Sequence, residues 1–219
     1  MKIVALLPLK AHSERIPRKN FKLLAGKPLF RWMLDTLVRT PEVDLVVINT
    51  DAQRELEESG LRPGEALIRE RRQALRGDFT SMNAIIKDDI EHVEADLYLM
   101  THVTNPLISS STVSAAIDAY QTGRGDSLFS VNRIQTRFYD SDGNAVNHDP
   151  DNLVRTQDLD VWYEENSCLY IFTRDGFKET GARIGKKPIM FETPRLESVD
   201  IDDPEDWQLA EALADTQVS

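Results

Sequence analysis

Short apolar runs alternate along most of the chain with longer segments whose apolar residues recur every three or four positions. The run at 44–49 is rich in β-branched residues, which is typical of a strand buried on both faces of a parallel sheet. The apolar residues after Pro28 recur at helical spacing, and Pro28 is suited to the first helical position. We expect strands at residues 3–7, 44–49, 66–68, 96–101, 127–131 and 168–173 and helices at 28–37, 52–59, 81–93, 111–120 and 204–214. This alternation predicts an α/β fold with a mostly parallel, doubly wound sheet, whose ligands bind beyond the carboxyl ends of the strands.

Residues 134–160 interrupt this alternation. Apolar residues are sparse there, and Asp142-Gly143 is a hairpin signal within a run of turn-forming residues. A stretch this long without a regular pattern is unusual inside a compact domain unless it has a function. The residues alone leave a flexible surface hairpin and a functional segment both open.

The composition is that of an ordinary globular protein, with 219 residues of which 41% are hydrophobic and 29% charged. No apolar run approaches the roughly 20 residues needed to span a bilayer, and the apolar start is too short for a signal peptide. The single cysteine, Cys168, excludes an intrachain disulfide and leads us to expect a cytoplasmic protein. The net charge of -11 argues against nucleic acid or an anionic membrane as a partner.

The loop after the first expected strand concentrates positive charge. Seven Lys or Arg residues and one acidic residue lie between Lys10 and Arg31. Basic side chains and backbone N–H groups that follow a strand suit a polyanion such as a triphosphate, whereas the alternative is a solvated basic surface loop. Gly26-Lys27 is not a Walker A motif, because the other glycines are absent and Pro28 follows in place of Ser or Thr.

The order of residues in this loop resembles the N-terminal signature of the acylneuraminate cytidylyltransferases, the enzymes that make CMP-sialic acids. That signature reads P-A-R-G-G-S-K-G-I-P-R-K-N and is followed by a run similar to A-G-K-P-L. Without gaps, it matches at Pro8, Ser13, 16–20 and 25–29. The chain departs from it at Lys10, where the family has Arg, at Glu14, where it has Lys, and at Arg15, where it has Gly.

The resemblance implies that residues 1–219 form one nucleotidyltransferase domain. It also implies that 134–160 is a small dimerisation arm that packs on a second subunit and completes its sugar site, so we expect a homodimer. In this family the signature loop holds CTP. The implied catalytic contacts to the phosphates are Lys10, Arg15 and Lys19, and the other implied nucleotide contacts in the loop are Leu9, Ser13 and Asn20.

A pair of aspartates lies near the end of the chain. Asp200 and Asp202 alternate with apolar residues, so on an extended segment both carboxylates face one way. Such a pair suits Mg²⁺, which takes one or two carboxylates together with phosphate oxygens and water. The alternative is a cap for the final helix, whose Pro204 is well placed at its start. The family has a similar D-I-D-x-x-x-D run that binds metal, which implies Asp200 and Asp202 as Mg²⁺ ligands, and we expect Asp203 to be the cap.

Segment 75–81, with Arg71 before it, resembles the family motif R-P-x-x-L-A-x-D-x-x-S. The match implicates Arg71 and Ser81 in nucleotide binding. Taken by itself, Ser81 fits a helix cap as well. The proline of the motif is absent, since Arg72 replaces it.

Segment 102–107, H-V-T-N-P-L, stands where the family has Q-P-T-S-P-L-R. The match implicates His102, Thr104 and Asn105 in sugar binding. His102 replaces a sugar-contacting Gln and Ile108 replaces an Arg, so these positions bear on which sugar is bound. A lone histidine at a strand end is otherwise usually structural or exposed to solvent.

Segment 155–170 resembles the region that ends in the family's N-G-A-I-Y strand, and Asn166 and Tyr170 match that motif. Both are therefore implied sugar-site residues. Arg155 is a candidate for the substrate carboxylate, because a guanidinium binds a carboxylate through two hydrogen bonds. The alternative for Arg155 is a surface salt bridge.

These matches imply a cytidylyltransferase in which the anomeric hydroxyl of a sialic acid-like 2-keto sugar acid attacks the α-phosphate of CTP and pyrophosphate is released. Such a transfer needs mainly positioning and charge neutralisation. One alternative is a metal-dependent glycosyltransferase, which also uses an Asp-x-Asp pair. The other is a nucleotide- or sugar-binding homologue that has lost catalysis, because the carboxylate of Glu14 repels phosphate.

Overall fold

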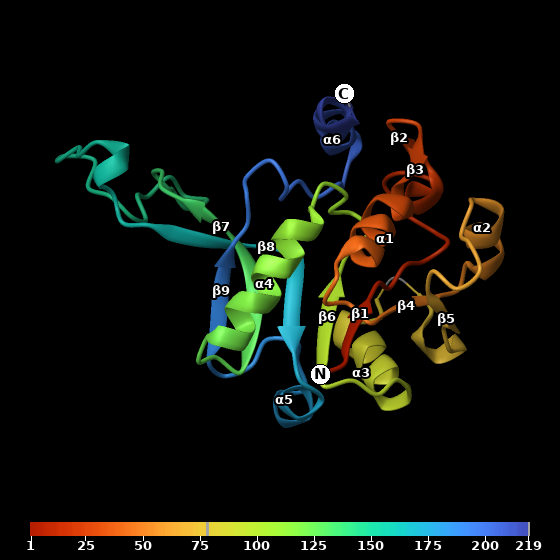
Figure 1. Cartoon of the computed structure of the whole chain (residues 1–219). Coiled ribbons are helices and arrows are strands. Elements are labelled where there is room, and N and C mark those ends of the chain that lie inside the picture. Colours follow the sequence, from red (N-terminus) through yellow and green to blue (C-terminus); the bar gives the residue numbers. More distant parts are fainter. Residues whose placement is uncertain (78, 219) are drawn as a thin grey trace.

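The computed structural model describes residues 1–77 and 79–218, and for 216–218 it describes the backbone alone. The described part of the chain forms a sheet of seven strands in the order β5-β4-β1-β6-β8-β7-β9 (Figure 1). β8 is antiparallel to its neighbours β6 and β7, and the other neighbouring strands are parallel. The strands are β1 (Ile3–Leu6), β4 (Leu45–Thr50), β5 (Leu67–Glu70), β6 (Leu97–Thr101), β7 (Ser127–Ile134), β8 (Trp162–Phe172) and β9 (Pro188–Glu192), and β2 (Leu23–Leu24) with β3 (Lys27–Pro28) forms a separate small hairpin.

Helices cover both faces of this sheet. They are α1 (Leu29–Arg39), α2 (Gln53–Glu58), α3 (Met82–His92), α4 (Ser110–Thr122), α5 (Arg174–Thr180) and α6 (Pro204–Val218), and short 3₁₀ turns occupy Lys19–Phe21, Gln73–Leu75 and Thr156–Asp158. Buried side chains of α1, α4 and α6 belong to one apolar cluster, whereas those of α3 and α5 belong to a second. The prediction of a mostly parallel, doubly wound sheet is confirmed.

The apolar runs of the central strands result from burial on both faces. In β1, Ile3 and Ala5 pack in the cluster that contains α1, and Val4 and Leu6 pack in the cluster that contains α3. Successive side chains of a strand point to opposite faces of the sheet. A strand between two layers of helices is therefore apolar at every position, and all four side chains are at most 2% exposed.

Three details differ from the sequence-based expectation. Pro28 precedes α1 as its cap residue, so the helix begins at Leu29. β8 begins at Trp162, well before residue 168. Its first four residues are exposed and include two glutamates, so no buried apolar run marked this half of the strand. α5 and β9 were not expected. α5 has only seven residues, and β9 lies at the edge of the sheet, where alternate side chains are exposed and no apolar run forms.

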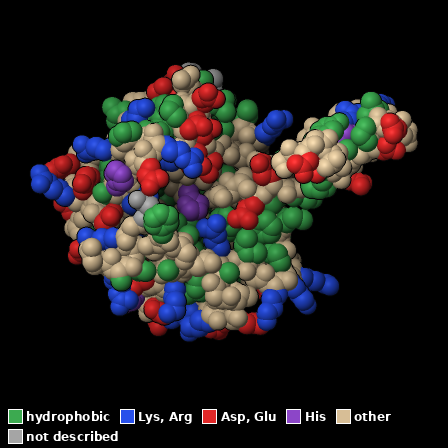
Figure 2. All heavy atoms as spheres, turned by 180° about the vertical axis from the view of Figure 1, so that it is seen from behind, with side chains coloured by type: hydrophobic (Ala, Val, Ile, Leu, Met, Phe, Trp, Pro, Cys, Tyr) green, Lys and Arg blue, Asp and Glu red, His purple; other side chains and the backbone are tan. Residues whose placement is uncertain are grey.

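The chain between β7 and β8 forms an arm that projects from the body, as Figures 1 and 2 both show. Its base is the pairing of Ile134 with Trp162. At its tip, Tyr139 pairs with Ala145 around a turn in which Gly143 has a φ of 84°. The predicted hairpin at Asp142-Gly143 is therefore present, and packing of the arm on a second subunit stays a prediction.

Cys168 is buried in β8 as a free thiol. Burial raises the pKa of this thiol, which keeps it protonated and unreactive at neutral pH. Within the described residues, none of the helices combines the length and the apolar character required to cross a membrane.

Candidate active site

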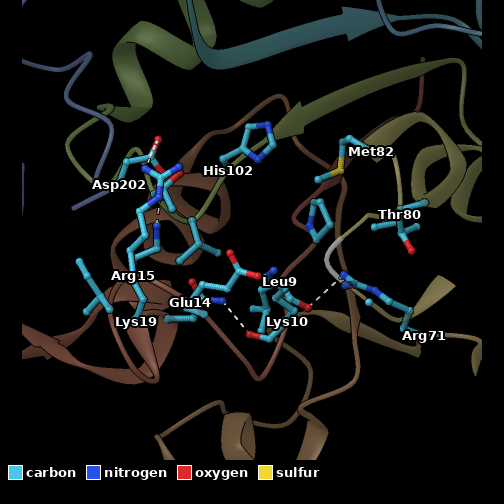
Figure 3. A pocket seen from close by; sticks show the side chains of 18 residues that line it. Leu9, Lys10, Glu14, Arg15, Lys19, Arg71, Thr80, Met82, His102 and Asp202 are labelled. Atoms are coloured by element: carbon cyan, nitrogen blue, oxygen red, sulfur yellow. Dashed lines mark hydrogen bonds and ion pairs between the residues drawn. The ribbon is translucent and has the colours of Figure 1, made fainter.

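A cavity of about 360 Å³ opens at the carboxyl ends of the parallel strands β1 and β6 (Figure 3). Four segments far apart in the sequence build its wall. They are the loop after β1, the segment between β5 and the first turns of α3, the loop after β6, and the segment before α6. The lining residues are Pro8, Leu9, Lys10, Ser13, Glu14, Arg15, Ile16, Lys19, Asn20, Arg71, Gly77, Thr80, Met82, Ile85, His102, Val103, Thr104 and Asp202.

The basic loop and Asp202 meet in this cavity, whereas Asp200 is not among the lining residues. Lys19 Nζ donates a hydrogen bond to the Ile201 carbonyl oxygen over 2.5 Å and lies 3.7 Å from Asp202 Oδ1. Arg15 Nη1 lies 3.3 Å from Asp202 Oδ2. Figure 3 shows Arg15, Lys19 and Asp202 pointing toward one another. The two segments that carried the sequence argument therefore form one site.

The Lys19 ammonium is held in a partly desolvated position. Lys19 is the first residue of a short 3₁₀ turn. Arg18, which precedes this turn, has a left-handed backbone with a φ of 54°, so the chain changes direction there. Burial lowers the pKa of Lys19, and the negative charges of Asp202 and Asp200 oppose that effect. A cation that has lost part of its hydration binds an incoming anion strongly, because less water has to be displaced.

Hydrogen bonds from two side chains hold the backbone at the start of the basic loop. Asn20 Nδ2 donates to the Lys10 carbonyl oxygen over 2.8 Å. Arg71 is buried, and its Nη2 donates to the carbonyl oxygens of Leu9 and Asn49 over 3.0 and 2.8 Å. Its Nε donates to Asn49 Oδ1 over 2.9 Å. Arg71 thus lines the cavity and also positions the loop after β1, and the sequence reasoning missed Asn49, a polar residue inside an apolar strand.

Ser81 differs from the other nucleotide-binding candidates. It caps α3 by accepting a hydrogen bond from the Ala84 N–H over 3.3 Å. Its neighbours Thr80 and Met82 line the cavity and Ser81 does not. Asp78 of the same motif lies outside the described residues.

In the segment before α6, one aspartate caps the helix and another faces the cavity. Asp203 Oδ1 accepts hydrogen bonds from the N–H groups of Glu205 and Asp206, and Asp206 Oδ2 accepts from the N–H groups of Asp202 and Asp203. This reciprocal pattern satisfies the helix start. The prediction that Asp203 is the cap is therefore confirmed, and Asp202 is left to face the cavity.

Asp200 shows the features of a metal ligand. Its Oδ1 is buried with no hydrogen-bond partner among the described residues. Burial raises the pKa of the Asp200 carboxyl, and the charge of Asp202 adds to this shift. A divalent cation would supply the missing partner for Asp200 and neutralise both carboxylates. No group of three or more His, Cys, Asp or Glu side chains in the described residues could hold a metal. Two carboxylates beside a basic loop are the donor set that suits Mg²⁺, which binds through few carboxylates and through substrate phosphates.

The predicted sugar-site residues occupy different places. His102 and Thr104 line the cavity, and Asn105 is fully buried behind them. Tyr170 is buried beside His102, with the two ring centroids 6.5 Å apart. His102 and Thr104 therefore reach the cavity, whereas Asn105 and Tyr170 are buried outside its lining.

Asn166 and Arg155 lie away from the cavity in this chain. Asn166 Nδ2 donates to Asn132 Oδ1 and Thr193 Oγ1 over 2.9 and 2.6 Å, so it ties β8 to β7 and to the segment after β9. Arg155 lies on the arm, where its Nε is 2.7 Å from Asp158 Oδ2. Within one subunit Arg155 therefore forms the surface salt bridge that the sequence left open as its alternative.

Arg183 is a residue of the site region that the sequence reasoning missed. Its Nη2 donates to the Tyr170 hydroxyl over 2.9 Å, and its Nη1 approaches His102 Nε2 at 3.5 Å. Burial, together with the charge of Arg183, lowers the pKa of His102 to about 4. Arg183 lies between α5 and β9 in a stretch with no recognisable motif, so no local signal marked it.

Comparison with known proteins gives the class that this fold and site define. A family model described as cytidylyltransferase matches residues 4–218. The chain therefore belongs to the cytidylyltransferase family. It is a nucleotidyltransferase, as the resemblance implied.

Curated relatives are similar over almost the whole chain. The CMP-N,N'-diacetyllegionaminic acid synthase of Legionella pneumophila is 29% identical, over 97% of this chain and 96% of its own length. The pseudaminic acid cytidylyltransferase of Campylobacter jejuni is 27% identical over the same shares. The N-acylneuraminate cytidylyltransferase of Oncorhynchus mykiss is 31% identical, over 95% of this chain and 49% of its own length. These names favour neither a glycosyltransferase nor a binding protein.

Solved structures confirm the fold. A CMP:2-keto-3-deoxy-manno-octonic acid synthetase complexed with CTP superposes with a TM-score of 0.72 at 16% identity, covering 99% of this chain and all of the other. The 2-C-methyl-D-erythritol 4-phosphate cytidylyltransferase of Thermus thermophilus has a TM-score of 0.66 at 19% identity, covering 98% of this chain and all of the other.

The shifted pKa of His102 predicts how stability depends on pH. The unfolded chain binds the proton near the ordinary pKa of 6.5, whereas the folded protein binds it only near 4. Protonation therefore favours the unfolded chain in this interval, and we expect the free energy of unfolding to fall as the pH is lowered from 6.5 to 4. His102→Gln should reduce that fall, as measured by urea unfolding at several pH values. Equal pH dependence in the parent and the variant would contradict the assignment.

Proposed function

We propose that the protein transfers CMP from CTP to a 2-keto sugar acid of the sialic acid type, with release of pyrophosphate. The meeting of the basic loop and Asp202 in one cavity carries this proposal, because a triphosphate needs positive charge and metal ligands together. The relatives named for legionaminic, pseudaminic and neuraminic acids support an acidic keto sugar as the acceptor. The single, buried Cys168 supports a reducing, cytoplasmic location.

In the proposed reaction the basic loop holds the phosphates. Lys10, Arg15 and Lys19 face the cavity, and their charge offsets the charge that develops on the leaving pyrophosphate. The anomeric hydroxyl loses its proton as its oxygen bonds to the α-phosphorus. The bond between the α-phosphorus and the oxygen that bridges to the β-phosphorus breaks, and this oxygen leaves as part of pyrophosphate. The protein contributes mainly position and electrostatics to this step.

Asp200 and Asp202 would hold Mg²⁺ beside the phosphates. The unpartnered Oδ1 of Asp200 and the raised pKa of that carboxyl support this assignment. When bound, the cation neutralises phosphate charge and polarises the reacting oxygens. Lys19, which contacts both the Ile201 carbonyl oxygen and Asp202, would keep this segment beside the phosphate loop.

We further propose that the arm packs on a second copy of the chain to form a homodimer. Tyr139, Leu153, Trp162 and Tyr163 are between 42% and 67% exposed on the arm or at its base. Burial of such side chains against a partner is favourable, at about 25 cal/mol for each Å² of apolar surface. In such a dimer Arg155 could reach the sugar site of the other copy, although it lies outside the cavity of its own.

Pyrophosphate release tests the proposed function directly. CTP and Mg²⁺ would be incubated with N-acetylneuraminate, N,N'-diacetyllegionaminate, pseudaminate and a shorter keto sugar acid in turn. We expect release with at least one of these acids and formation of the matching CMP-sugar. CTP binding without release from any acid would contradict the proposal and support the homologue that has lost catalysis.

We expect Lys19→Ala to lower turnover by about two orders of magnitude, since a charge-assisted contact contributes roughly 1.5–3 kcal/mol and each 1.36 kcal/mol is a factor of ten. Lys22→Ala is the matched control, because Lys22 lies over the Trp207 ring and outside the cavity. Its turnover should stay within about twofold of the parent. Wild-type rates in Lys19→Ala would remove Lys19 from the site.

We expect Asp202→Asn to raise the Mg²⁺ concentration needed for half-maximal turnover by about tenfold or more, because the variant loses one carboxylate ligand. Its melting temperature should change little, since the Asp202 side chain is exposed and does not cap α6. Asp203→Ala should show the opposite result, with a loss of about 1 kcal/mol of stability and unchanged metal dependence. A large loss of stability in Asp202→Asn with unchanged metal dependence would favour a structural role.

We expect Leu153→Glu to shift the protein from dimer toward monomer, because a charge would be placed in the proposed arm interface. Light scattering after gel filtration at several concentrations would measure the mass. Leu209→Glu is a control of similar exposure on α6 and should leave the mass unchanged. A parent protein that is monomeric at all concentrations would contradict the dimer.

A further inference from the structure

Arg183 is held in a fixed orientation beside His102, a residue that lines the cavity. Its guanidinium stacks on the Tyr170 ring, 3.7 Å from the centroid, and its Nη2 donates to the hydroxyl of the same residue. The side chain is only 19% exposed. A guanidinium stacked on an aromatic ring presents its N–H groups edge-on, as bidentate recognition of a planar oxygen group requires.

His102 connects Arg183 to the cavity. It lines the cavity and lies 3.5 Å from Arg183 Nη1. The charges of Arg183, Asp202 and Lys19 all act on the His102 ring, so this ring lies close to both the phosphate-binding cations and Arg183. Because Nε2 faces the Arg183 donor, a neutral ring carries its proton on Nδ1. The site therefore has a second positive position besides the basic loop.

Part of the hydrogen-bonding capacity of Arg183 is held by weak partners. Nη1 contacts His102 Nε2 at 3.5 Å and Met100 Sδ at 3.8 Å, both longer than a good N–H···O bond. The nearest carboxylate, Glu165, lies 3.6 Å from Nη2 and also accepts a hydrogen bond from the Tyr170 hydroxyl. A ligand oxygen at ordinary distance would be a better partner for Nη1 than either present contact.

Ile108, which follows the cavity-lining loop after β6, is 2% exposed inside the apolar cluster of α1 and supplies no donor to a ligand. Arg183 comes from a different segment and places a guanidinium beside His102, which does line the cavity.

We propose that Arg183 is a specificity-determining residue that binds a carbonyl-type oxygen of the acceptor sugar acid, supplied either by its carboxylate or by an acyl amide. Lys19 and Arg15 serve the nucleotide phosphates, and Tyr170 orients the Arg183 guanidinium. The inference rests on the proposed function, since it assigns a contact within the same acceptor site.

Two substitutions test the contact. Arg183→Met removes the donors and keeps an unbranched side chain over Tyr170, and Arg183→Lys keeps the charge without the planar fork. We expect Arg183→Met to raise the KM for the sugar acid by tenfold to a hundredfold and to leave the KM for CTP within about twofold. Arg183→Lys should raise the KM for the sugar acid by a smaller factor and serves as the test if Arg183→Met does not fold.

Arg174→Met is the matched control. Arg174 Nη2 likewise donates to a tyrosine hydroxyl, that of Tyr98, over 3.0 Å, but outside the cavity. This variant should leave both KM values within about twofold. An unchanged KM for the sugar acid in Arg183→Met, or a parallel rise of both KM values, would overturn the proposal.

Two analogues of the accepted acid identify the oxygen that is bound, namely its C1 amide and its free amine without the acyl group, each measured as a competitive inhibitor. If the Ki of one analogue is the same for the parent enzyme and for Arg183→Met, that analogue lacks the group that Arg183 binds. If Arg183→Met changes the values for both analogues and for the parent acid by the same factor, the proposal is overturned.

A parent enzyme inactive with every acid would refute the proposed function and this inference together. An active parent with an unchanged KM in the variant would refute only this inference.

Discussion

The hydrogen bond from the Lys19 ammonium to the Ile201 carbonyl oxygen joins residues 182 positions apart, and the site depends on it. The basic loop would repel itself if its cations were gathered without a counter-charge, and Asp200 and Asp202 would do the same. Placed side by side, the two groups offset each other's charge. In the function we propose, the protein assembles a phosphate- and metal-binding arrangement before either ligand arrives, and the ligands replace these internal ion pairs with stronger ones.

The contact between Lys19 and Ile201 is supported by the central strands of the sheet. The fully buried strands β1, β4 and β6 fix where their carboxyl ends lie, and the loop after β1 is held from behind by Arg71 through the backbone of Leu9 and Asn49. The net charge of -11 of the whole chain does not disturb the local patch, since exposed charges more than about 8–10 Å apart are largely screened at physiological salt. An acidic protein can thus bind a highly charged nucleotide at one place.

The part of the cavity near His102 differs electrostatically from the part that the basic loop lines. Here His102, whose pKa is lowered to about 4 so that the ring is neutral at pH 7, lies beside Arg183 and lines the cavity together with Lys19 and Arg15. Specificity for one sugar acid over another requires fixed donors whose partners are missing in the wrong substrate. A guanidinium stacked on Tyr170 meets that requirement better than a mobile surface cation, because its orientation is fixed before the sugar binds.

Local patterns in the sequence determined much of this protein. Buried strands between two helix layers are apolar at every position, and a helix shows its period within a dozen residues, so the α/β class and most of the strands and helices could be predicted. The contiguous basic loop and the D-I-D run identified the cytidylyltransferase family in the same way, and Asp203 could be assigned as a cap because capping acts within one helical turn. Only the tertiary structure decided that Asn166 ties β8 to the segment after β9, that Arg155 lies outside its own cavity and that Arg183 reaches Tyr170 and His102. Contacts of this kind depend on side chains from distant segments meeting across a folded sheet, and no spacing within one segment records where those segments will lie.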